Sequence, residues 1–220
     1  MPRTITVKGI GKVSAAPDLV VLSMGLESQD MDYEKAMSIA SENIEHLNEA
    51  LEKVGFEKKS VKTTNFNVRT DYEYKRKKDG TNERIFNGYI VNHNLKVEFD
   101  FDSARLTKAL SAVGSCLAHP QLSIAFTVKD ATAINEEMLR SATANAKRKA
   151  EILCDASGKE LGELLSIDYN WGELNVYSKT RYAVEDNCLA APMMAKCANI
   201  EIEPDNIDVS DTATFVWEIK

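Results

Sequence analysis

Two hydrophobic periods alternate along the chain, one of three to four residues and one of two residues. The longest helical period follows Asp130, where the apolar positions that share one face are Ile134, Met138, Ala142, Ala146, Ala150 and Leu153. Asp130 is suited to cap the start of this helix, and Gly158 is suited to the left-handed residue that ends it. Because the middle of the apolar face is alanine, we expect the helix backbone to approach a sheet closely.

Two further helices are predicted in the first half of the chain. One covers residues 31–54, with an apolar stripe that includes Tyr33, and ends at Gly55. The other is short and runs from a cap at Asp102 to Gly114.

Alternating apolar and polar residues predict strands between these helices. They cover residues 5–7, 20–26, 61–74, 85–99, 122–128, 165–171 and 213–219. Gly9 and Gly11 interrupt the first strand in the way that a bulge or a bend does. The long strands 61–74 and 85–99 flank a charged hairpin tip with Asp79-Gly80 as its turn.

The order of these elements predicts an α+β fold. Strands with clean alternation suit antiparallel sheets, and helices with a single stripe suit packing on one face of them. We expect two long helices and one short helix on one face, within a single domain over residues 1–220. A strand-helix-strand order occurs in residues 19–74 and again in 121–177, which predicts two lobes of similar topology.

Charge and composition narrow the choice of partners and compartment. The formal net charge is −7, which argues against nucleic acid, and no apolar run approaches the ~20 residues that span a bilayer. The start of the chain enters a strand pattern without the profile of a signal peptide, and the four cysteines form no CxxC pair. We therefore expect a reduced, cytoplasmic protein in which Cys116 and Cys154 are small buried apolar residues.

Several short motifs resemble the SIMPL-domain family of bacterial proteins. They are residues 5–18 (ITVKGIGKVSAAPD), 88–92 (GYIVN), 146–151 (AKRKAE), 158–162 (GKELG) and 202–209 (IEPDNIDV). The resemblance covers nearly the whole chain. It implies an α+β fold, homo-oligomeric ring- or channel-like assembly and a loose link to oxidative stress, and it implies no catalytic residues.

Isolated residues with possible chemistry have simpler structural interpretations. His93 stands in an apolar strand row, which favours a hydrogen-bonded structural histidine over a base or a metal ligand. Cys116 and His119 follow Gly114 and resemble a catalytic pair, but sequence proximity supplies no orienting group, so loop residues are the favoured interpretation. The basic run Lys75–Lys78 is interpreted as a solvated charge cluster at a hairpin tip.

The segment from Cys188 to Cys197 is the strongest candidate for binding chemistry. Cys188, Met193, Met194 and Cys197 are soft donors of the kind that select Cu(I). The spacing matches no recognised metal signature, and Met and Ala equally suit an adaptable apolar contact. Packing at an interface or in the core is favoured, and we expect no cofactor and no resident metal.

These observations favour a non-enzymatic assembly or interaction protein that forms a homo-oligomer. Its contacts are expected from strand edges at both chain ends, from the long hairpin and from residues 178–208, where the apolar stretch 189–195 suits an interface. The alternative is a small-molecule or soft-metal-binding stress protein that uses the Cys188–Cys197 loop. An enzyme is disfavoured, because no set of nucleophile, base and orienting group is found.

Overall fold

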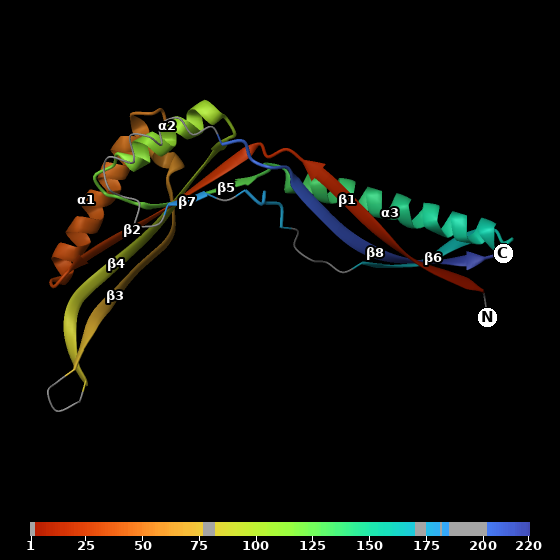
Figure 1. Ribbon diagram of the computed structural model, residues 1–220, viewed down its shortest axis with the longest axis horizontal. Coiled ribbons are helices and arrows are strands. Elements are labelled where there is room, and N and C mark those ends of the chain that lie inside the picture. Colours follow the sequence, from red (N-terminus) through yellow and green to blue (C-terminus); the bar gives the residue numbers. More distant parts are fainter. Residues whose placement is uncertain (1–2, 77–81, 170–174, 181, 185–201) are drawn as a thin grey trace. The chain divides into compact units, whose positions relative to one another are not determined.

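The computed structural model describes residues 3–76, 82–169, 175–180, 182–184 and 202–220, without the side chains of residues 183 and 184. The chain divides into two compact units. We call them the terminal unit, formed by Met1–Asp18, Thr127–Lys179 and Pro204–Lys220, and the central unit, formed by Leu19–Phe126 and Thr180–Glu203. Each contains an antiparallel sheet with helix on it, which confirms the α+β class (Figure 1). The single domain over residues 1–220, with similar halves at 19–74 and 121–177, stays a prediction.

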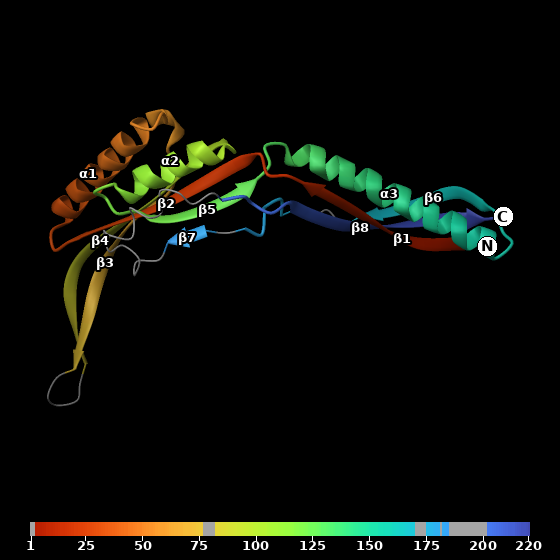
Figure 2. The ribbon, with the colours of Figure 1, turned by 45° about the horizontal axis from the view of Figure 1, so that its top comes forward.

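The terminal unit is a three-stranded sheet covered by one long helix. Its strands β1 (Thr4–Ala15), β8 (Ile207–Ile219) and β6 (Leu161–Tyr169) lie in the order β1-β8-β6, with β8 antiparallel to both neighbours. The helix α3 (Ala131–Ala156) runs along this sheet over β1 and β8 (Figures 1 and 2). The predicted final strand has its apolar face inward, because Ala213, Phe215 and Trp217 are buried.

Helix α3 begins and ends where its sequence predicts. The Asp130 carboxylate accepts a hydrogen bond from the Ala133 amide at 2.9 Å, and Gly158 has a φ of +66° just after the helix. The buried stripe confirms the prediction up to Ala150 and then passes to Cys154, which is 1% exposed. Leu153 was assigned to this stripe wrongly, since it is 53% exposed. A strict four-residue step from Ala150 reaches position 154, so Leu153 lies on the flank of the stripe.

The prediction of a bulge or a bend at Gly9 and Gly11 in the first strand is wrong. Strand β1 pairs with β8 without a register shift from Thr4 to Ala15. A Cβ atom at Gly9 would collide with the carbonyl oxygen of Ala142, and one at Gly11 would collide with that of Met138. The two glycines are therefore the surface on which the backbone of α3 rests, and they keep an extended strand conformation.

The central unit is a five-stranded sheet with two helices on one side (Figure 2). Its strand order is β3-β4-β2-β5-β7. The strands are β2 (Leu19–Asp30), β3 (Lys62–Arg76), β4 (Asn82–Asp100), β5 (Gln121–Thr127) and β7 (Tyr182–Val184), and the helices are α1 (Tyr33–Glu52), the short 3₁₀ helix η1 (Lys58–Ser60) and α2 (Ser103–Gly114). The core lies between the sheet and the helices. Its fully buried members include Leu22, Met24, Leu47, Leu95 and Phe126.

Caps define the helices of the central unit as the sequence predicts. The Asp102 carboxylate accepts from the Arg105 amide at 2.8 Å at the start of α2. Gly55 has a φ of +93° after α1, as expected of a residue that ends a helix. Tyr33 departs from the predicted buried stripe, because it is 49% exposed and packs edge-on against Tyr89 with ring centroids 5.5 Å apart.

The predicted long hairpin is present and extends past its neighbour in the sheet. Strand β2 pairs with β4 only between Tyr89 and Asp100, so the earlier part of β4 pairs with β3 alone. A register shift between Asp71 and Tyr72 faces Gly88, whose φ is +107°. The Asp71 carboxylate accepts from Asn87 at 2.6 Å and from Gln29 at 3.3 Å, which holds this irregular point together. The turn at Asp79-Gly80 lies outside the described residues.

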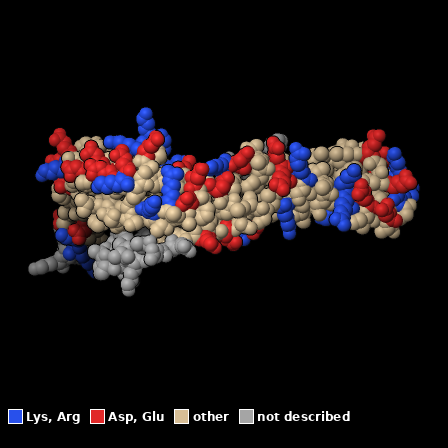
Figure 3. All heavy atoms as spheres, turned by 90° about the horizontal axis from the view of Figure 1, so that it is seen from above, with Lys and Arg blue, Asp and Glu red and all other residues tan. Residues whose placement is uncertain are grey.

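Charged side chains of both signs are interspersed on one face of the molecule. On the face that Figure 3 shows, Lys and Arg lie among Asp and Glu. Lys75 lies 3.4 Å from Glu73, so the part of the basic run that the structure describes is accompanied by an acidic side chain. Among the helices of the described residues, none is both long and apolar enough to cross a membrane.

Candidate functional site

His93 is hydrogen-bonded across the sheet, as its position in the strand predicts. Its Nε2 atom lies 2.9 Å from Thr63 Oγ1 on the neighbouring strand, and its ring stands edge-on to Phe66 with centroids 5.1 Å apart. Burial lowers the pKa of His93 from its ordinary value of 6.5, which favours the neutral ring. His93 of β4 thus contacts Thr63 and Phe66 of β3 and links the two strands.

Cys116 and His119 are close in the sequence, but they line different cavities. The backbone amide of His119 donates to the carbonyl of Cys116 at 3.2 Å, so the two residues form a tight turn after α2. Cys116 is buried and its thiol lines the groove between α1 and α2. His119 is exposed and lines a different cavity. The loop interpretation therefore describes their geometry.

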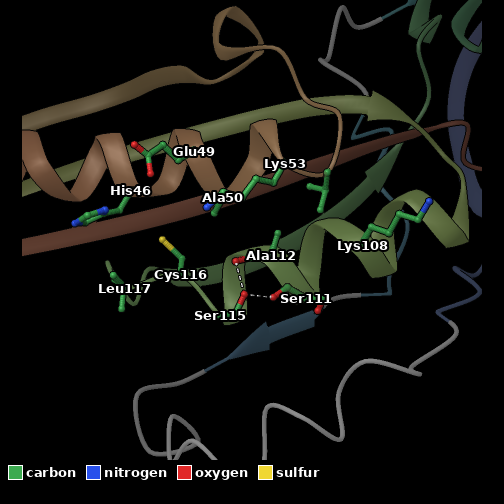
Figure 4. A pocket seen from close by; sticks show the side chains of 11 residues that line it. His46, Glu49, Ala50, Lys53, Lys108, Ser111, Ala112, Ser115, Cys116 and Leu117 are labelled. Carbon is green, nitrogen blue, oxygen red and sulfur yellow. Dashed lines mark hydrogen bonds between the residues drawn. The ribbon is translucent and has the colours of Figure 1, made fainter.

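A groove of about 400 Å³ lies between α1 and α2 (Figure 4). Helix α1 contributes His46, Glu49 and Ala50 to its wall, and Lys53 just after the helix also lines it. Figure 4 shows the Cys116 sulfur directed toward α1. The opposite wall comes from α2, whose final turn is closed by Ser115. Its hydroxyl donates to the carbonyl oxygens of Ser111 at 2.9 Å and Ala112 at 3.2 Å.

The thiol in this groove is poorly suited to nucleophilic chemistry. Burial raises the pKa of Cys116, and the backbone hydrogen bond at Ala118 and the charge of Lys53 offset only part of that effect. A protonated thiol is a weak nucleophile. Apolar side chains such as Val54 and Leu117 line the groove together with the charged side chains of Glu49, Lys53 and Lys108.

The second cavity lies on the side of the sheet opposite to the helices and is strongly polar. Its volume is about 270 Å³. The residues that line it are Gly25, Leu26 and Glu27 of β2, Asn92 and Asn94 of β4, His119 of the loop before β5, and Gln121 of β5. Alternation along β2 sends Leu22, Met24 and Leu26 into the core and turns Gly25 and Glu27 to this side.

Sequence reasoning did not identify this polar cavity. Its signal was present in the strand pattern, where asparagine, a residue depleted in strands, occurs at positions 65, 67, 92 and 94. The pairing of β3 with β4 places Asn65 opposite Asn94 and Asn67 opposite Asn92. The strand register was needed to see that these residues form one surface.

The soft-donor candidates Cys188, Met193, Met194 and Cys197 all lie outside the described residues, as does the apolar stretch 189–195. Within the described part of the chain, no group of three or more His, Cys, Asp or Glu side chains is arranged to hold a metal ion. Cys116 and Cys154 are both free and buried, as predicted.

The fold defines an α+β protein of two units, each an antiparallel sheet with helix on one side. Residues 5–217 match the sequence profile of the SIMPL family, described as "Protein of unknown function (DUF541)", and the chain belongs to this family. It is similar to the 26 kDa periplasmic immunogenic protein of Brucella melitensis biotype 1, with 28% identity over 166 residues. The same-named protein of Brucella abortus strain S19 is 27% identical over 166 residues. Each match covers 76% of this chain and 66% of the relative.

The relatives correct the expected cytoplasmic location. Both are named as periplasmic proteins, which points to export. The two cysteines that the structure describes do not report on the compartment. Cys116 and Cys154 are 4% and 1% exposed, and buried thiols stay unreactive in an oxidising or a reducing compartment. The strand pattern at the start of the chain likewise describes β1 and carries no information on location.

Proposed function

We propose that the protein is an exported, non-enzymatic assembly protein that forms a homo-oligomer through the edge of β6 with which no strand of the described residues pairs. The observation that carries the proposal is the exposure of this strand. Leu164, Leu165 and Ile167 are 47%, 49% and 54% exposed. Leu164 lies opposite Trp217 and Ile167 opposite Phe215, and a register shift between Leu164 and Ser166 leaves Leu165 without a partner in β8. The exposed apolar side chains therefore follow one another along the outer strand of the sheet.

Strand β1, at the opposite edge of the same sheet, differs from β6 because side chains of α3 hydrogen-bond to its backbone. The amide of Ile10 donates to Asn145 Oδ1 at 3.1 Å, and the Lys149 ammonium donates to the carbonyl of Lys8 at 3.1 Å. Side chains of α3 thus occupy hydrogen-bonding groups of β1 that face away from β8. Proteins commonly cover or pair a strand edge, because an open one recruits other chains.

This arrangement revises which edges we expected to take part in assembly. The strands at both chain ends are β1 and β8, and neither offers an open edge of the predicted kind: β8 is the central strand, and α3 hydrogen-bonds along β1. The third strand of that sheet, β6, takes their place in the proposal. The long hairpin remains a second contact, since β3 is an edge strand and its Phe66 and Tyr74 are 47% and 66% exposed.

Three finer parts of the proposal rest on other grounds. Export follows from the names of the Brucella relatives. A stress-related role and a ring-like arrangement follow from the family resemblance alone. The contribution of residues 178–208 to assembly follows from their apolar, non-periodic composition. The alternative, a small-molecule or soft-metal protein that uses the Cys188–Cys197 loop, is tested by metal content before and after a Cys188→Ser, Cys197→Ser exchange.

The test of assembly is sedimentation velocity on a Leu164→Lys, Ile167→Lys double variant. Two ammonium groups on the exposed edge strand oppose pairing with a second copy, so we expect dissociation to the 24.5 kDa chain. The matched control is Leu117→Lys, which replaces a 74% exposed leucine of the central unit. An oligomer that survives the double variant and the control equally would reject β6 as the contact. Deletion of residues 189–196 tests the second segment in the same way.

A further inference from the structure

The polar cavity beneath the central sheet has features that its role in the fold does not require. Asparagine is disfavoured in strands, yet Asn65 and Asn67 lie directly across from Asn94 and Asn92. All four lie on the side of the sheet away from the core, where threonine would serve the strand better. A residue that is disfavoured in its local structure and brings no gain in packing is typical of a functional surface.

Gly25 provides a second, independent observation. It lies inside β2, an interior strand of the sheet, where a glycine weakens the strand and often marks the close approach of another molecule. A Cβ atom at this position would lie 3.4 Å from Asn94 Oδ1 and 3.8 Å from the Gln121 Cβ atom. The absence of a side chain therefore keeps the floor of the cavity open between Asn94 and Gln121.

His119 at the rim provides a third observation. Its φ is +45°, and it is the only non-glycine residue with positive φ in the described part of the chain. Such conformations concentrate at binding sites, where the surrounding structure holds them. Here the turn that follows α2 holds His119, and the residue lines the cavity beside Gln121.

We propose that this cavity binds a neutral, hydroxyl-rich ligand, specifically one residue of an uncharged saccharide. Carboxamides donate and accept hydrogen bonds at once, as hydroxyl groups do, and the Glu27 carboxylate accepts from two neighbouring hydroxyls. The described lining contains no lysine or arginine to balance an anion. The volume of about 270 Å³ is close to the lower end of small-molecule pockets and suits one sugar ring.

The lining also sets the strength and selectivity of this binding. No phenylalanine, tyrosine or tryptophan is among the described lining residues, so the imidazole of His119 is the one small ring on which a nucleobase or another flat ring could stack there. A saccharide bound by hydrogen bonds alone exchanges them for those it makes with water, and the expected Kd is therefore weak, about 1 mM. The site is a recognition surface and involves no covalent step. It is independent of the β6 contact, since all of its lining residues belong to the central unit.

Saturation-transfer difference NMR on the full chain tests the proposal, with maltotriose and triacetylchitotriose as neutral probes and trigalacturonate as an anionic probe. We expect signals from at least one neutral probe and weaker signals from the anionic one. An Asn92→Ala, Asn94→Ala double variant removes two hydrogen-bonding side chains and should weaken binding about tenfold. The matched control is Asn82→Ala, an exposed asparagine of the same strand that does not line the cavity.

A second variant keeps the test informative if the double variant misfolds. Gly25→Ala adds one methyl group at the cavity floor, in an extended strand that accepts alanine, and should weaken binding while the circular dichroism spectrum stays unchanged. The proposal is overturned if neither neutral probe gives a signal with the unmodified protein. It is also overturned if both cavity variants bind as well as Asn82→Ala, or if trigalacturonate binds more tightly than the neutral probes.

Discussion

Gly9 of β1 lies directly against Ala142 of α3, so close that a Cβ atom at position 9 would meet the Ala142 carbonyl oxygen. The same hypothetical atom would lie 2.8 Å from the Ala146 Cβ atom. Small residues on both elements therefore permit a helix-on-strand contact at backbone distance. This contact positions α3 so that its polar side chains reach the edge of β1.

Gly9→Ala should destabilise the terminal unit. The added methyl group has no space, and either α3 or β1 must move, which costs about 1–3 kcal/mol. Urea unfolding monitored by circular dichroism measures the change. Lys12→Ala on the same strand is the control, because Lys12 is exposed. A Gly9→Ala variant as stable as the unmodified chain would contradict the close approach.

Ala146→Leu should destabilise by a similar amount, about 1–3 kcal/mol, because Ala146 is 0% exposed and three further carbons must enter a packed contact. The neighbouring Lys147 is exposed, so Lys147→Leu should cost much less. Equal losses of unfolding free energy in the two variants would mean that the inward face of α3 is assigned wrongly.

Asn145→Ala should open the edge of β1. Loss of the 3.1 Å hydrogen bond from the Ile10 amide should cost about 0.5–1.5 kcal/mol and speed exchange of that amide with solvent. Amide hydrogen exchange followed by NMR provides the measurement at residue resolution. Thr143→Ala, an exposed position on the same helix, should leave the Ile10 amide protected. Unchanged protection in Asn145→Ala would show that Asn145 does not cover this edge.

The lowered pKa of His93 predicts that the free energy of unfolding decreases as the pH falls. Its pKa is lowered by burial in the folded chain, so the unfolded chain binds the proton more readily as pH falls below the ordinary value of 6.5. The stability associated with neutral His93 is therefore present above pH 6.5 and lost between 6.5 and the lower pKa of the folded state. His93→Gln should lose less stability than the unmodified chain between pH 7.5 and 5, and His46→Gln serves as the exposed control. If the free energy of unfolding changed with pH in the same way in all three proteins, His93 would not be the source of this pH dependence.

The sequence predicts most elements of the fold because their signals are local. Asp102, Asp130, Gly55 and Gly158 act within a few residues of their own positions, and the caps formed as expected. Predictions that depended on distant partners were less accurate. Gly9 and Gly11 were interpreted as a local break because their partner, α3, is more than 120 residues away in the chain.

The candidate sites, too, could be predicted where the signal is local but not where it depends on residues distant in the sequence. The hydrogen bond of His93 was expected from its own strand row, whereas the polar cavity needs β2, β4, β5 and the loop at His119 to be brought together. The exposure of Leu164 and Ile167 also lay beyond the reach of the sequence, since alternation in β6 looks the same whether or not a helix covers the strand. The Cys188–Cys197 segment stays a prediction, because it lies outside the described residues.

The most direct test of the proposed function is the absolute mass of the unmodified protein in solution. Size exclusion coupled to light scattering gives this mass without any assumption about shape, and a dilution series at micromolar concentrations shows whether it depends on concentration. Assembly through β6 predicts a mass that is a multiple of the 24.5 kDa chain. A single species of 24.5 kDa across the whole series would contradict the proposal that this protein functions as a homo-oligomer.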